Sequence, residues 1–282
     1  MVFTLPSELR ALGLHAPREL FGALCAAASE TLLELGKSRL DARLGVTMVL
    51  HTWTRELRFH PHVHALVTAG GLAMDGSRWS PSNRKYLFPV EVMGALLRGK
   101  MLAALRVLHA RGAFASFADF ADPEAFDRLM TKLARPKRWI VYAKQPFARV
   151  DHVLKYLGRY THRVGIANSR LVDVRADAVT FRTKSGKTVT VAPVEFLRRF
   201  VQHVLPDGFH KIRHFGLYAG AAEVGDMLFQ RGQWPHWTYH NQYATGMAQA
   251  TNPPQSWPTK TALSISNASS RSTRSPQSSP SP

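Results

Sequence analysis

The stretch "RFHPHVHALVTAGGL", Arg58 to Leu72, places three histidines at alternate positions of a segment with the composition of a β-strand. Because successive side chains of a strand point to opposite faces, His60, His62 and His64 are expected to share one face. Neighbours on that face lie about 6–7 Å apart, so two of these imidazoles can reach one divalent ion. Neutral imidazole is the commonest metal ligand in proteins. The pattern therefore predicts a metal site built on a strand.

A second interpretation of these histidines is chance, because the chain has 13 of them and some His-x-His pairs arise by accident. Three histidines in phase inside an apolar strand favour the site, since burying several imidazoles without partners is costly. Pro61 lies among them and lacks the N–H that a ladder uses. Proline fits the edge of a sheet or the start of a strand rather than its centre.

The stretch "KYLGRYTHR", residues 155–163, supplies a second group of reactive side chains. Tyr156 and Tyr160 are four residues apart in a predicted helix and so lie on one face. A phenol with a pKa of about 10 is a poor nucleophile at neutral pH. A nearby cation stabilises the phenolate, and a bound metal polarises the phosphate that it attacks. The alternative is that the two tyrosines are aromatic anchors at the rim of the core.

The charge of the chain indicates a polyanionic partner. Lys and Arg number 37 against 19 Asp and Glu, which gives a formal net charge of +18 in 282 residues. This excess is not needed for folding and points to nucleic acid first and an anionic membrane second. Beside the tyrosines, the candidate DNA contacts are Lys155, Arg159 and Arg163.

Other features bound the class of protein. No apolar run reaches the length of about 18 residues that a membrane span needs, and the first 20 residues lack the pattern of a signal peptide. A single cysteine, Cys25, excludes an intramolecular disulfide and a cysteine-cluster zinc site. A cytoplasmic protein that works on nucleic acid is therefore expected.

Hydrophobic periodicity predicts an α+β fold in which an antiparallel sheet carries helices on one face. The segments 44–53 and 58–70 are predicted to pair as a hairpin across the turn "TREL". The remaining expected elements are a helical segment 5–40 broken near Pro17, helices 90–112 and 123–135, a strand 137–147, a helix 148–163, and two short strands around "KSGK" followed by a helix within 170–204.

Three regions are expected along the chain: a helical N-terminal segment 1–40, a catalytic domain 41–220 and a divergent tail 221–282. From about Ala250 onward Pro, Ser, Thr, Asn and Gln dominate. That composition buries too little apolar surface to offset chain entropy, so the tail is expected to be disordered.

Histidines that bind a metal and tyrosines that act as nucleophiles are together the groups needed to cut single-stranded DNA through a 5′-phosphotyrosine bond. The chain resembles the two-tyrosine rolling-circle transposases of bacterial insertion sequences, within the HUH nuclease superfamily. The resemblance covers roughly residues 2–219. It runs through "VFTLPSELR", "LGVTMVLHTWTRELRFHPHVHALVTAGGL", "VLKYLGRYTHRVGIANSRL" and "GFHKIRHFGLYA". The joint occurrence of HPHVH and YLGRYTHR is its most specific feature.

The resemblance implies a sheet of HUH-nuclease type and metal-dependent cleavage and transfer of single-stranded DNA at transposon ends and targets. Tyr156 and Tyr160 match the two nucleophiles of the family. One would attack the scissile phosphate and leave a 5′-phosphotyrosine and a free 3′-hydroxyl, and the second would then take the second strand. No nucleotide cofactor is implied, because the phosphotyrosine conserves the bond energy. The implied location is the bacterial cytoplasm, at the nucleoid.

The resemblance also implies a set of metal ligands. His62 and His64 match the paired ligands of the superfamily, whose third ligand varies. Several relatives take the third ligand from the preceding strand, where this chain has His51. His60 and Glu56 are the alternatives. The expected ion is Mg²⁺ or Mn²⁺, although imidazoles would also accept Zn²⁺ or Co²⁺ in vitro.

Two departures from the family pattern bear on activity. Family members usually carry an N-terminal cysteine-rich zinc-binding domain, and this chain begins where that domain would end. The pattern is also lost after Ala219. A catalytic core from a truncated or frameshifted element is therefore expected. One rival is a basic nucleic-acid-binding protein without catalysis. The other is a zinc hydrolase, which lacks an obvious carboxylate base beside the histidines and gives the tyrosines no role.

Overall fold

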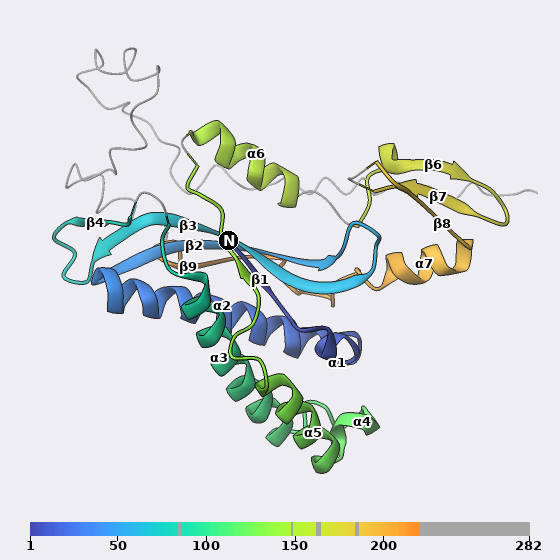
Figure 1. Ribbon diagram of the computed structural model, residues 1–282, viewed down its shortest axis with the longest axis horizontal. Coiled ribbons are helices and arrows are strands. Elements are labelled where there is room, and N and C mark those ends of the chain that lie inside the picture. The colour runs from blue at the N-terminus through green and yellow to red at the C-terminus, as the bar shows by residue number, and fades with distance from the viewer. Residues whose placement is uncertain (84–85, 148, 162–164, 184–185, 220–282) are drawn as a thin grey trace, which may run out of the picture. The chain divides into compact units, whose positions relative to one another are not determined.

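The computed structural model describes residues 1–83, 86–147, 149–161, 165–183 and 186–219 (Figure 1). The chain divides into two units, Met1–Thr238 and Tyr239–Pro282, and every described residue belongs to the first. Helices and antiparallel sheets are both present in it, which confirms the predicted α+β class. The tail predicted over 221–282 lies outside the described residues.

Two sheets and the helices around them make up the described part of the first unit. Its elements in chain order are β1 (Val2–Thr4), η1 (Ser7–Leu9), α1 (Arg10–His15), α2 (Pro17–Leu40), β2 (Ala42–Trp53), β3 (Phe59–Ala73), β4 (Trp79–Pro81), α3 (Val90–Ala110), α4 (Ala118–Ala121), α5 (Pro123–Ala134), β5 (Val141–Tyr142), α6 (Val150–Thr161), η2 (Asn168–Arg170), β6 (Leu171–Val174), β7 (Val179–Arg182), β8 (Thr188–Val191), α7 (Pro193–Val201) and β9 (Ile212–Gly216). The predicted break near Pro17 is confirmed, since α1 ends at His15 and proline occupies the first turn of α2, where its missing N–H costs nothing.

The larger sheet has the strand order β5-β1-β3-β2-β9, with β4 paired to the far end of β3. All of its pairings are antiparallel, and the predicted hairpin of β2 and β3 is confirmed. Because β3 lies between β1 and β2, the edge position considered for Pro61 is wrong. Pro61 lies instead near the start of β3, where the β2–β3 register shifts between His51 and Trp53. That irregularity accommodates a residue without an N–H.

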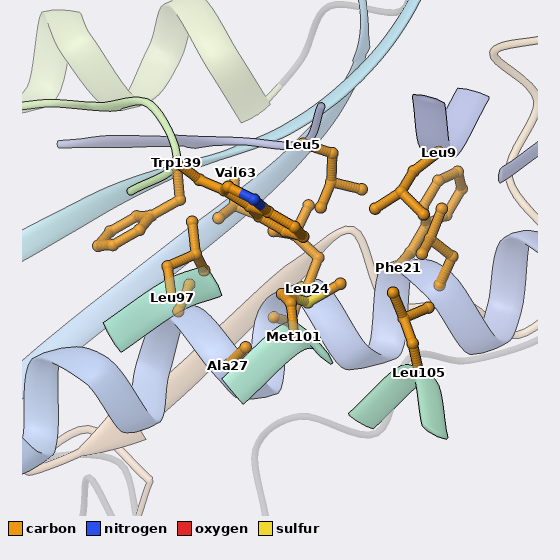
Figure 2. Close-up of a cluster of buried hydrophobic side chains, with 14 of the residues drawn as sticks. Leu5, Leu9, Phe21, Leu24, Ala27, Val63, Leu97, Met101, Leu105 and Trp139 are labelled. Carbon is orange, nitrogen blue, oxygen red and sulfur yellow. The ribbon is translucent and has the colours of Figure 1, made fainter. Parts of the chain in front are cut away.

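One face of this sheet forms the main core. Alternate residues of β2 and β3, including Met48, Leu50 and Val63, are buried against α2. Figure 2 shows Val63 in one cluster with Leu24 of α2 and Met101 of α3. The alternation that buries one set of side chains sends the histidines to the other face.

Helix α6 lies on the other side of the sheet from α2 (Figure 1). The prediction that the helices share one face is therefore wrong for α6. Its amphipathic sequence predicts a helix but does not tell which face of the sheet receives it. The hydrogen bond from α6 to β3 described below belongs to this second face.

Several elements differ from the prediction for one physical reason. Strands β1, β4 and β9 were not predicted, the strand predicted over 137–147 shortens to Val141–Tyr142, and the two strands expected around "KSGK" belong to a three-stranded sheet, β6-β7-β8. Strands as short as β1, β4 and β9 show too few alternations to be recognised unless a turn such as "KSGK" joins two of them. They exist because a distant strand supplies their hydrogen-bond partners, and these partners are not visible in local sequence.

Candidate metal and tyrosine site

Three histidines from two adjacent strands converge on the face of the large sheet that lies toward α6. His51 of β2 lies directly opposite His62 of β3, and His64 follows two residues later on the same face. The ring centroids of His51 and His64 are 4.6 Å apart, and those of His62 and His64 are 5.0 Å apart. One nitrogen from each of the three rings lies within 4.8 Å of the others, so the group could hold a metal ion.

The surroundings of His62 and His64 keep these two rings in the neutral, ligating form. His51 and His64 are only 5% and 8% exposed. Desolvation by burial lowers the pKa of His62 to about 4 and, together with nearby positive charges, that of His64 to about 2. The Nδ1 of His62 lies 2.7 Å from the His60 carbonyl. Because a carbonyl only accepts, Nδ1 carries the proton and Nε2 keeps its lone pair for an ion.

The structure separates the three candidates for the third ligand. His51 belongs to the convergent group, whereas His60 and Glu56 do not. The His60 ring lies 5.6 Å from that of His62 and is partly exposed. Glu56 lies in the β2–β3 turn and pairs with Arg58 at 3.1 Å. No carboxylate joins the three histidines among the residues that the structure describes.

Trp53, which the sequence analysis did not single out, forms a wall of the histidine group. Its indole stacks on the His51 ring with centroids 4.4 Å apart and an interplanar angle of 18°. The ammonium of Lys211, which precedes β9, lies 5.3 Å from the indole centroid. The stacking fixes the orientation of the His51 ring. The available signal was the spacing of two residues from His51, which puts both side chains on one strand face.

Tyr156 brings α6 to the histidine group. Its hydroxyl lies 3.0 Å from Nδ1 of His64, a hydrogen bond between residues 92 positions apart. The ring is also packed against Phe147, with centroids 5.3 Å apart. The structure thus places one of the two predicted nucleophiles against a predicted metal ligand. This geometry would carry a phenol oxygen to within reach of a phosphate bound at the histidines.

The other residues predicted around the tyrosines are described only in part. Lys155 is largely exposed and its ammonium lies 3.7 Å from the carboxylate of Asp151. The side chains of Arg159 and Tyr160, and all of Arg163, lie outside the described residues. Their expected roles stay predictions.

Comparison with known proteins identifies the family. The family model described as "Putative transposase" matches residues 45–224, which include all three convergent histidines and Tyr156. The chain belongs to this transposase family. It is 40% identical over 227 residues to "Putative transposase y4qJ" of Sinorhizobium fredii. It is 30% identical over 228 residues to "Transposase for insertion sequence element IS801" of Pseudomonas savastanoi pv. phaseolicola. The predicted resemblance to transposases of bacterial insertion sequences is thereby confirmed.

The matches cover 77% and 78% of this chain but only 57% and 53% of the two relatives, so the transposase-family chain spans about half of their length. No solved structure matches it. In the ranges that the structure describes, no helix combines the length and the apolarity that crossing a lipid bilayer requires.

In this transposase-family chain, the turn that joins the two histidine-bearing strands is fixed from outside. Three consecutive carbonyls of the turn accept side-chain hydrogen bonds from η2, from α7 and from the segment just after α7. The pairs are Arg170 with the Arg55 carbonyl at 2.6 Å, Arg199 with that of Glu56 at 3.2 Å, and His203 with that of Leu57 at 3.2 Å. We call these three donors the turn clamp. They were missed from sequence, because nothing local relates residues 115 or more positions from the turn.

His203 is the buried member of the turn clamp. Its Nε2 must donate to the Leu57 carbonyl, so its Nδ1 accepts from the Thr52 hydroxyl at 3.1 Å. Burial lowers the pKa of His203, which favours this neutral form. Leu57 itself is fully buried with a φ of 58°, an unusual conformation for leucine. The three hydrogen bonds of the turn clamp therefore hold a turn that contains one strained residue. This turn joins the strands that carry His51 and His62.

Proposed function

We propose that this chain carries the catalytic core of a DNA-strand transferase that cuts single-stranded DNA through a 5′-phosphotyrosine, as in rolling-circle transposition. The observation that carries the proposal is the 3.0 Å contact between the Tyr156 hydroxyl and His64 of the three-histidine group. The core is proposed to be residues 41–220, and the substrate to be DNA at insertion-sequence ends and targets. Membership of a transposase family supports DNA as the substrate.

The proposed metal ligands are His51, His62 and His64. The donor set fits a divalent ion, because the three nitrogens converge and desolvation holds two of these rings neutral. Three imidazoles without a carboxylate suit Mn²⁺, Co²⁺ or Zn²⁺ better than Mg²⁺, which prefers oxygen ligands. When bound, the ion would supply Lewis-acid polarisation of the scissile phosphate.

The chain's own residues position the reacting atoms. The hydrogen bond with His64 orients the hydroxyl of Tyr156, and the packing on Phe147 restricts its ring. In the proposed step the tyrosine oxygen bonds to phosphorus while the bond from phosphorus to the 3′-oxygen breaks. The phenol loses its proton and the leaving oxygen gains one, so a free 3′-hydroxyl departs and the 5′-phosphate stays on the protein.

A second nucleophile would complete the strand exchange. Tyr160 follows Tyr156 by one helical turn of α6, so one helix can present both residues to one substrate. Lys155, Arg159 and Arg163 are proposed to contact the DNA backbone around them. Neutralising phosphates would make affinity for single-stranded DNA fall steeply with salt.

The test is formation of a covalent adduct. The full chain is incubated with internally labelled single-stranded DNA and Mn²⁺, and the products are separated by denaturing electrophoresis. Wild-type protein should give a labelled band at the size of protein plus DNA, and EDTA should prevent it. Tyr156→Phe should remove the first adduct, whereas Tyr86→Phe, at an exposed tyrosine just before α3, should not. DNA binding without any adduct would support the non-catalytic rival instead.

A further inference from the structure

The histidine face of the large sheet continues past His64 to the edge strand β5. Val2 of β1 lies opposite His64 of β3 on one side and opposite Tyr142 of β5 on the other. Residues directly opposite each other in antiparallel strands share a face. Tyr142 therefore points to the same face as His64, two strands away. At the usual spacing of strands, that separation is about 10 Å.

The two sides of β5 differ sharply in exposure. Val141 is 9% exposed and packs in the main core beside Phe3. Tyr142 is 56% exposed, and Ile140, whose carbonyl accepts from the Thr4 N–H, is 74% exposed. Val141 anchors the strand to the core together with the neighbouring Trp139 and Ala143, whereas Tyr142 does not. The exposed aromatic ring on the histidine side is thus not explained by folding.

A positive charge follows Tyr142 along the chain. Lys144 follows Tyr142 by two residues and is exposed. It lies in the segment that leads from Tyr142, on the histidine side of β5, to Phe147. Phe147 then packs on Tyr156. The segment 142–147 therefore runs from the edge of the sheet to the candidate nucleophile, and we call it the β5–α6 strip.

We propose that the β5–α6 strip is a binding subsite for the single strand next to the scissile phosphate, in which Tyr142 stacks on a base and Lys144 contacts a phosphate. Aromatic rings and cations in alternation are the general means of holding single-stranded nucleic acid. The net charge of +18 favours a polyanion over a second copy of this equally basic chain. A base within a duplex is already stacked, so the subsite selects unpaired DNA. The inference rests on the proposed function for the position of the scissile phosphate.

The first test measures binding alone. Full-length protein is titrated into a fluorescent oligo-dT in EDTA, so that neither metal nor cleavage contributes. Loss of one base stack in Tyr142→Ala should weaken affinity by about five- to 150-fold. Tyr142→Phe keeps the ring and should bind like wild type. The matched control is Tyr86→Ala. Tyr86 has a similar exposure but lies outside the β5–α6 strip, so this variant should bind like wild type.

A second measurement shows that the effect is stacking. Oligonucleotides with one abasic position, moved base by base along the strand, should reveal a position whose loss weakens wild type but leaves Tyr142→Ala unchanged. Lys144→Ala should make the slope of log affinity against log salt shallower by about 0.7. Parallel losses for Tyr142→Ala at every abasic position would overturn the stacking role.

The outcomes separate this proposal from the proposed function. Unchanged DNA affinity in Tyr142→Ala overturns the subsite while adduct formation through Tyr156 still stands. Failure of wild-type protein to bind single-stranded DNA overturns both. Unchanged DNA affinity together with a change in oligomeric mass, measured by light scattering, would show that the edge of β5 pairs with another copy and would also overturn the subsite.

Discussion

The two faces of the β2–β3 hairpin have opposite chemistry on the same backbone. On the face toward α2, side chains such as Met48, Leu50 and Val63 are almost fully buried among carbon atoms. On the other face the same two strands carry His51, His62 and His64. Because a strand alternates its side chains with a period of two, successive residues of these strands face the core and the histidine group in turn. The comparison predicts that substitutions one position apart have different kinds of effect.

The largest effect is expected on the histidine face. Replacing His62 and His64 together by Ala should abolish the covalent adduct and lower affinity for Mn²⁺ or Co²⁺ by at least about 100-fold, since even residues that only support ligands change it by about 10–100-fold. The unfolding midpoint in EDTA should stay near that of wild type, because neither side chain belongs to the main core. Calorimetric metal titration measures the affinity, and thermal unfolding measures the midpoint. Undiminished metal affinity would refute the ligand assignment.

The covered face should respond in stability alone. Leu50→Ala removes a buried side chain from the main core and should lower the free energy of unfolding by about 2–5 kcal/mol. Denaturant titration checks this value. Thr47→Val, on the same strand and the histidine face, is the control; it removes only the exposed hydrogen bond to His214 at 3.0 Å and should lower the free energy of unfolding by at most about 1.5 kcal/mol. Equal losses in both variants would contradict the division of the hairpin into two faces.

The turn clamp should contribute an intermediate effect. His203→Ala leaves the Leu57 carbonyl and the Thr52 hydroxyl without the partners seen here. Unsatisfied buried groups cost about 1–3 kcal/mol, so the free energy of unfolding should fall by about that amount at neutral pH. Because the turn positions His51 against His62, metal affinity should fall as well. A stability loss with unchanged metal affinity would limit His203 to a structural role.

The smallest effect concerns pH. Burial lowers the pKa of His203 in the folded chain, whereas the unfolded value is near about 6.5. The unfolded state therefore binds more protons below that value, and stability falls as the pH drops from about 6.5 toward the folded pKa. One histidine contributes at most about 1.4 kcal/mol per pH unit in this window. Thermal unfolding at pH 7.5 and 5.5 should show a smaller acid loss for His203→Gln than for wild type.

The sequence predicted those parts of the fold and the candidate site that depend on local pattern. Alternation indicated the hairpin and the shared face of His62 and His64, and Pro17 marked the break between α1 and α2. The face of the sheet on which α6 packs, and the formation of the short strand β5, depend on partners far along the chain. The hydrophobic periodicity of a segment does not indicate which distant segment it pairs with.

The site shows the same division. The resemblance implies His51 as a ligand, but its ring meets the other two only through the β2–β3 register and its bulge. The turn clamp was not predictable, since Arg170, Arg199 and His203 act through backbone carbonyls whose identity leaves no trace in the side-chain pattern. Sequence thus predicted which histidines share a face better than it predicted the residues that hold them in place.

The central claim is that the three-histidine group of the large sheet and Tyr156 of α6 form one reaction site. Identifying the tyrosine that carries DNA tests it most directly. After reaction of wild-type protein with single-stranded DNA and Mn²⁺, nuclease and protease digestion followed by mass spectrometry locates the nucleotide-bearing peptide. The account predicts a nucleotide on Tyr156, with Tyr160 as the second position, and no modified peptide when His62 and His64 are both Ala. A nucleotide attached outside α6, or a normal yield in Tyr156→Phe with Tyr160→Phe, would contradict it.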